Sequence, residues 1–243
     1  MKRLAILLTL LLLTGGATLH GQEREKNLLS VRGGLTVAHM RATLDDLSGI
    51  TGTRAGYHIE VADEVLLHRR LPLYLETGIG FTSGGGSYDR LALRPMYFRI
   101  PLLLNTRIRL ARDWSLLASA GGWYAVGLGG KIRSSTEWYD LFGEKGALRR
   151  ADAGVRMSLG IEWRRLLLRA GYDLGCRNLL KRDYTLPSDP DGALAALHFN
   201  TLRSRHLFIG LGYRFCILRL PHTTEPFLDL ERPLSSSRLF LRP

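Results

Sequence analysis

The segment "RHLFIGLGYRF", residues 205–215, alternates between two kinds of side chain. In a β-strand, successive side chains point to opposite faces, so the odd positions from Leu207 to Phe215 form one apolar face. The other face carries His206, Arg214 and two glycines. Glycine-rich alternation that ends on an aromatic residue is typical of the last strand of an outer-membrane β-barrel, in which lipid-facing and lumen-facing residues alternate.

Seven further segments show the same period of two, which favours half-buried strands. They lie near residues 29–39, 53–66, 71–82, 94–110, 114–132, 152–163 and 165–177. The sequence therefore predicts an all-β protein whose strands number eight.

The connections between these segments differ in length in a regular way. Short ones lie around residues 68–70, 111–113 and 164–165, and long ones cover residues 40–52, 83–93, 133–150 and 179–203. Short turns at one end and long loops at the other are the outer-membrane arrangement, with the short turns in the periplasm. We therefore expect an eight-stranded antiparallel up-and-down transmembrane β-barrel with long extracellular loops. A soluble lipocalin-like barrel is the alternative.

The N-terminus has the features of a secretory signal peptide. Lys2 and Arg3 precede the apolar run "LAILLTLLLL", residues 4–13, and small and polar residues follow up to a cleavage site near Gly21. The expected location is the cell outer membrane, with outer-membrane lipid around the barrel. The chain is expected to consist of a signal peptide at residues 1–21, the barrel domain at residues 22–216 and a periplasmic tail at residues 217–243.

The formal net charge of +12 could indicate a nucleic-acid partner. An exported chain meets little nucleic acid, and the arginines are spread singly along the sequence, so we expect no nucleic-acid partner. Cys176 and Cys216 end neighbouring strands that run in opposite directions. They should lie near opposite faces of the membrane, beyond the reach of a disulfide, so two free thiols are expected.

Charged residues recur on the faces expected to line the lumen. We expect a lumen network of Arg32, Arg54, Glu60, Glu76, Arg99, Arg107, Arg156, Glu162, Arg169, Asp173 and Arg214. These residues could line an anion-preferring pore. Because unpaired buried arginines are costly, a salt-bridged plug with Glu76 at its centre is favoured in so narrow a barrel.

Catalytic and cofactor motifs are weak in this sequence. His39 precedes Asp45 and Asp46 at the expected outer rim, which leaves open a lipid-modifying enzyme; the other histidines lack the spacing that such enzymes show. The histidines and cysteines have no metal-ligand spacing. A non-enzymatic protein without a metal or cofactor is the preferred interpretation.

The tail mixes large apolar residues with prolines at 221, 226, 233 and 243. The prolines exclude a continuous helix or a central strand. Disordered segments are usually poor in large apolar residues, so docking on a periplasmic or secretion-machinery protein through residues 217–243 is favoured. Docking against the barrel mouth and disorder are the alternatives.

Several segments in order resemble the PorT-like outer-membrane β-barrels of the Bacteroidota. The matching segments are "VRGGLTVAHM", "LYLETGIGF", "YFRIPLLLNTRI", "ASAGGWYAVGLGG", "DAGVRMSLGIEW", "RAGYDLGCRNL" and "LGYRF", which together span most of residues 29–216. The resemblance implies an outer-membrane barrel and, through the named member, a role in protein export by the type IX secretion route. A structural or adhesive barrel that acts through its extracellular loops, and a narrow channel, are the alternatives.

Overall fold

The computed structural model describes most of the chain between residues 25 and 219. The described ranges are 25–44, 47–50, 52–67, 71–88, 91–133, 138–143, 146, 148–181 and 199–219. The expected signal peptide and residues 220–243 of the expected tail lie outside the described residues.

Eight long strands and three short ones make up the regular structure of the described residues, which contain no helix. The long strands are β1 (Glu25–Leu44), β3 (Arg54–Leu66), β4 (Leu73–Ser83), β6 (Leu91–Arg109), β7 (Trp114–Arg133), β9 (Ala151–Trp163), β10 (Leu166–Gly175) and β11 (Phe199–Arg219). The short strands are β2 (Leu47–Ile50), β5 (Gly86–Tyr88) and β8 (Trp138–Asp140).

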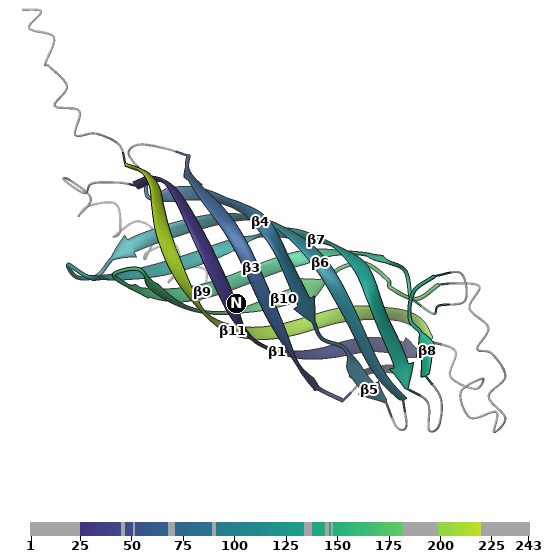
Figure 1. Cartoon of the computed structure of the whole chain (residues 1–243). Helices are drawn as coiled ribbons and strands as arrows, with labels where there is room; N and C mark the ends of the chain where they lie inside the picture. Colours follow the sequence, from purple (N-terminus) through teal and green to yellow (C-terminus); the bar gives the residue numbers. More distant parts are fainter. Residues whose placement is uncertain are drawn as a thin grey trace, which may run out of the picture.

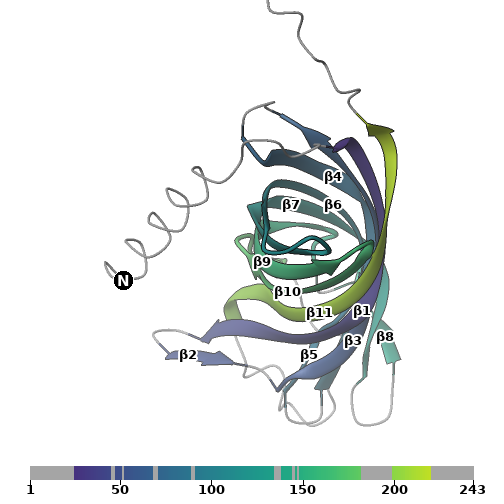
Figure 2. The ribbon, with the colours of Figure 1, turned by 90° about the vertical axis from the view of Figure 1, so that its left-hand side faces the viewer.

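The long strands close into a barrel (Figure 1, Figure 2). Each pairs antiparallel with the next long strand along the chain, and β11 returns to pair with β1. Closure leaves these strands no free edge within the ring, so their backbone groups are paired without water. The expected eight-stranded antiparallel up-and-down topology is confirmed.

Burial in this barrel is the reverse of that in a soluble protein. Leu35 and Leu211 point outward and are 66% and 68% exposed, whereas Arg214 and Glu76 point inward and are 0% exposed. Along β9 the alternation is regular, with every second side chain buried from Arg156 to Glu162. An apolar exterior around a polar interior is stable in lipid, so the barrel spans a membrane and the lipocalin-like alternative is excluded. The described residues include no helix whose length and hydropathy would let it pass through a membrane.

Aromatic residues mark the end of the barrel that carries the short turns. Trp114 and Trp163 are register partners whose rings stack with centroids 6.1 Å apart. Tyr213 and Phe215 make an edge-to-face contact at 4.8 Å on β11. Aromatic belts of this kind lie at membrane interfaces. Short turns face the periplasm in outer-membrane barrels, so we refer to this end as the inner end and to the opposite end as the outer end.

The strands are longer than a membrane requires. β1 and β7 have 20 residues each, whereas about 9–11 are enough to cross the bilayer. Parts of the expected loops at 40–52, 83–93, 133–150 and 179–203 therefore belong to strands. Pairing with β2, β5 and β8, and the pairing of residues 199–203 of β11 with β1, satisfy their backbone groups beyond the lipid. At the inner end, β11 passes residue 216 and pairs with β1 as far as Arg219.

Both cysteines are free, as expected from the sequence. Cys176 follows the outer end of β10 and is exposed, while Cys216 lies near the inner end of β11 and is partly buried.

Candidate functional site

A network of ion pairs crosses the middle of the lumen, and Glu76 on β4 is its most shared carboxylate. Arg32 on β1 donates to Glu76 Oε1 at 2.7 Å and to Oε2 at 3.2 Å. Arg169 on β10 donates from Nη1 to both oxygens at 3.0 Å, and Asn105 on β6 donates from Nδ2 at 2.5 Å. Four strands are thus joined through one carboxylate that is 0% exposed.

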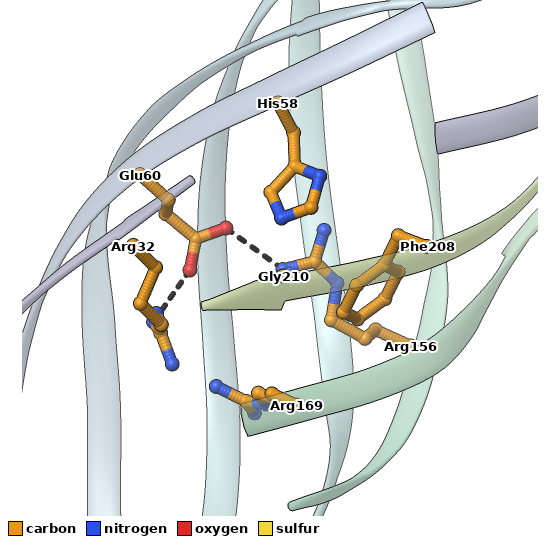
Figure 3. A pocket seen from close by; sticks show the side chains of 7 residues that line it. All are labelled: Arg32, His58, Glu60, Arg156, Arg169, Phe208 and Gly210. Atoms are coloured by element: carbon orange, nitrogen blue, oxygen red, sulfur yellow. Dashed lines mark hydrogen bonds and ion pairs between the residues drawn. The ribbon is translucent and has the colours of Figure 1, made fainter. Parts of the chain in front are cut away.

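A second carboxylate extends this network toward the outer end. Glu60 on β3 accepts from Arg32 at 2.5 Å and from Arg156 on β9 at 2.8 Å (Figure 3). Arg156 also donates to Asp173 on β10, from Nε to Oδ1 at 2.7 Å and from Nη2 to Oδ2 at 3.1 Å. Asp173 is in addition paired with Arg99 on β6. The charges therefore alternate across the lumen.

Aromatic rings and hydroxyls fill the space beside these charges. The guanidinium of Arg156 lies 4.7 Å from the centroid of the Phe208 ring, and that of Arg99 lies 4.3 Å from the centroid of the Trp123 ring. Such cation–π contacts stabilise an arginine without requiring another carboxylate. Arg169 also donates from Nε to Ser158 Oγ at 2.7 Å.

A separate charged cluster occupies the inner end. Arg214 on β11 is 0% exposed and pairs with Glu64 at 2.6 Å and with Glu162. Arg107 lies 3.6 Å from Glu64 and 3.5 Å from Glu162, with its guanidinium 5.2 Å from the centroid of the Tyr74 ring. Two carboxylates and two arginines therefore close the lumen below the central network.

The central network leaves little free space. A cavity beside it, lined by residues that include Arg32, His58, Glu60 and Phe208, has a volume of about 10 Å³ (Figure 3). That volume is about enough for one water molecule. The lumen at this level is filled by side chains rather than open to solvent.

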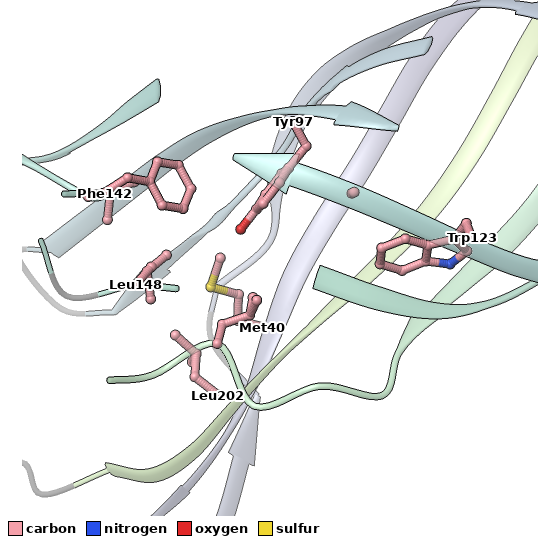
Figure 4. Close-up of a cluster of buried hydrophobic side chains, with 9 residues drawn as sticks. Met40, Tyr97, Trp123, Phe142, Leu148 and Leu202 are labelled. Carbon is pink, nitrogen blue, oxygen red and sulfur yellow. The ribbon is translucent and has the colours of Figure 1, made fainter. Parts of the chain in front are cut away.

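An apolar cluster, which we call the outer cap, fills the barrel above the charges. Tyr97 and Phe142 make an edge-to-face contact with ring centroids 5.7 Å apart (Figure 4). Leu141 is fully buried. The cap comprises Met40, Tyr97, Trp123, Ala125, Leu141, Phe142, Leu148, Leu179 and Leu202. Leu141, Phe142, Leu148 and Leu179 belong to the described parts of the connections that follow β8 and β10, and their side chains pack in the outer mouth of the barrel.

The structure brings ten of the eleven expected lumen residues into ion pairs; Arg54 is the exception. Arg54 begins β3 at the outer end, is half-buried, and has no ion-pair partner among the described residues. A position at the outer mouth allows its guanidinium to remain hydrated.

The expected lumen network did not include Glu64, Asp152 or His206, which are buried in the structure, although the alternation had already put His206 on the inward face. Glu64 pairs with Arg214, Asp152 accepts from Ser204 at 2.6 Å, and His206 Nδ1 lies 3.1 Å from Arg99 Nη2. Glu64 lies four residues after Glu60 on the same strand, so it faces the lumen as Glu60 does. The period of two in the sequence was enough to predict its position.

Of the residues that left open a lipid-modifying enzyme, the structure describes only His39. His39 lies on the outward face of β1, with its ring centroid 6.5 Å from that of Tyr172. Asp45 and Asp46 lie outside the described residues. Within the described part of the chain, no group of three or more His, Cys, Asp or Glu side chains is placed to hold a metal ion.

No family model matches the chain, and no curated protein matches its sequence. Among solved structures, the chain is similar to the attachment invasion locus protein Ail of Yersinia pestis, with 13% identity, a TM-score of 0.39, and coverage of 78% of this chain and 99% of that one. Neisserial surface protein A has 10% identity, a TM-score of 0.43 and coverage of 77% and 97%. The outer membrane protein OprG from Pseudomonas aeruginosa has 12% identity, a TM-score of 0.35 and coverage of 79% and 98%. At these TM-scores the likenesses support no conclusion about function.

Proposed function

We propose that this chain is a non-enzymatic outer-membrane barrel with a permanently filled lumen, which acts as a membrane anchor through surfaces outside that lumen. The proposal rests on a continuous chain of ion pairs that crosses the barrel from wall to wall. Its members, in order, are Arg169, Glu76, Arg32, Glu60 and Arg156. A pore would need water and ions where these side chains pair.

The energetics favour a closed lumen over a gated one. Removing one partner from a buried ion pair costs about 3–5 kcal/mol, because the remaining charge stays buried. Opening a continuous path would separate several such pairs and also displace the outer cap. The barrel is therefore expected to remain closed under ordinary thermal fluctuation.

The finer proposal is assistance to a secretion assembly, for which the support is the resemblance to the PorT-like barrels. β11 ends at Arg219 at the inner end, which this proposal takes as the periplasmic side, and residues 220–243 follow it in the sequence. These residues combine large apolar side chains with prolines, a composition suited to docking on a partner as short extended pieces.

Complementation of a deletion strain tests the secretion role. The strain would receive the full chain or a version that stops after Arg219, which keeps all of β11. With equal amounts of both versions in the outer membrane, the full chain should restore surface and secreted proteins and the shortened chain should not. Unchanged secretion in the deletion strain would contradict the proposal.

A second candidate is a surface or adhesive barrel that acts through its outer connections. The outer cap supports this candidate, because Leu141, Phe142 and Leu148, which belong to the connection that follows β8, are buried in the barrel mouth. In this case, replacement of that connection by a short turn should abolish surface attachment while secretion stays normal. A lipid-modifying enzyme would instead change the lipid A mass profile on deletion, and we expect no such change.

A further inference from the structure

The seam between β1 and β11 carries ordered rungs of paired side chains on its outward face. Leu35 pairs with Ile209 and Val37 pairs with Leu207, and all four are 43–66% exposed to the lipid. The next rungs toward the outer end are basic: His39 pairs with Arg205, and Arg41 pairs with Arg203. The rung above is polar, with Thr201 Oγ1 donating to Thr43 Oγ1 at 3.0 Å.

The basic rungs lie at the outer edge of the apolar band. Ten residues separate Arg205 from the aromatic Phe215 along β11. At about 3.3 Å per residue and a strand tilt of about 40°, this corresponds to about 25 Å along the membrane normal, which is the usual height of the lipid-facing band. Arg203 and Arg205 are therefore level with the headgroups of the outer leaflet.

These arginines lack the counter-charges that the lumen arginines have. Among the described residues, no carboxylate lies within ion-pair distance of Arg203 or Arg205, and Arg205 Nε is buried without a hydrogen-bond partner. Neighbouring positions on the outward wall are apolar or aromatic, with Tyr172 beside His39 and Leu174 opposite Arg205. Arg203 and Arg205 lie two positions apart on the same outward face of β11, and like charges this close repel each other unless an anion neutralises them.

We propose that this seam is a binding site for one phosphate-bearing lipid of the outer leaflet. The phosphate is held by Arg203 and Arg205, with Arg41 and His39 on the facing strand beside it, and the acyl chains lie on the apolar rungs below. Arginine is suited to phosphate because its planar group donates paired hydrogen bonds. Basic clusters beside membrane-spanning elements recognise anionic headgroups by the same electrostatics. The inference rests on the outer-membrane location in the proposed function.

The test uses the full mature chain refolded in detergent, with lipid A that carries both phosphates as the probe and native mass spectrometry as the readout. Wild type should bind one lipid A about tenfold more tightly than R203Q/R205Q, as expected for lost charge-assisted hydrogen bonds. The control R109Q/R112Q removes two exposed arginines at the inner end and should bind like wild type. Equal binding by wild type and R203Q/R205Q would overturn the proposal.

Two measurements on wild type keep the test independent of how the variant folds. Lipid A without phosphates should bind about tenfold more weakly than the phosphorylated form, and equal binding would show an apolar contact only. Inorganic phosphate in excess should not displace the lipid, and displacement would identify a site for a free anion instead. Failure of the proposed function would appear separately, as a steady ion current through the reconstituted barrel.

Discussion

Arg169 donates hydrogen bonds from one nitrogen, Nη1, to both carboxylate oxygens of Glu76, at 3.0 Å each. The two side chains are only 9% and 0% exposed. Glu76→Ala would leave Arg169 and Arg32 buried with less compensating charge, and should lower the free energy of unfolding by about 3–5 kcal/mol. Urea titration of the barrel in lipid vesicles measures this change.

The matched control for this change is Asp113→Asn. Asp113 lies 3.7 Å from Arg164 in an exposed pair, with side-chain exposures of 44% and 67%. Surface pairs of this kind contribute less than about 1 kcal/mol. Similar losses for Glu76→Ala and Asp113→Asn would mean that the lumen is hydrated and the central network is not a buried structure.

A double substitution separates pairing from burial. Glu76→Met and Arg169→Met should each be strongly destabilising, because each leaves a buried charge behind. The double variant should be more stable than the sum of the single losses predicts, by about 1–3 kcal/mol, since neither charge then remains. The measurement is a double-mutant cycle in urea. Additive losses would indicate that the two side chains do not interact.

The period of two in the sequence predicted the strands and the inward face because a barrel wall separates lipid from lumen at every residue. It could not predict which arginine pairs with which carboxylate. Arg156 and Glu60, for example, lie 96 positions apart and meet across the lumen. Their pairing depends on register and on the number of strands, which are properties of the closed ring.

The outer cap was harder to foresee for a related reason. Leu141, Phe142 and Leu148 come from a connection with no regular alternation, and they are buried because their side chains pack in the barrel mouth. The local sequence does not show which residues of a connection will pack inside the barrel. The short strands β5 and β8 also depend on pairing with the projecting ends of β6 and β7.

Gly34 on β1 provides room for the seam to close. A Cβ atom at Gly34 would lie 2.1 Å from the carbonyl oxygen of Ile209 and 2.9 Å from His58 Cε1. Gly34→Ala should therefore reduce the yield of folded barrel severalfold, as measured by the heat-dependent mobility of barrels on gels. Its neighbour Gly33 points outward, where an added Cβ would meet nothing closer than 3.7 Å, so Gly33→Ala should fold normally. Equal yields would argue against a tight seam.

The two thiols report the orientation of the barrel. Cys176 at the outer end should react with a large, membrane-impermeant maleimide on intact cells, whereas Cys216 near the inner end should react only after the outer membrane is permeabilised. The variants Cys216→Ser and Cys176→Ser isolate each thiol for this measurement. Labelling of Cys216 on intact cells would reverse the assigned orientation.

The central claim is that side chains close the lumen, and the current through single barrels in a planar lipid bilayer tests it most directly. The purified chain, produced as residues 22–243, should insert without steady conductance in 1 M salt. A triple variant, Arg32→Ala/Glu76→Ala/Arg169→Ala, which empties the middle of the network, serves as the comparison and should increase leakage. A stable, ohmic current through the unaltered barrel would contradict the account and identify the protein as a channel.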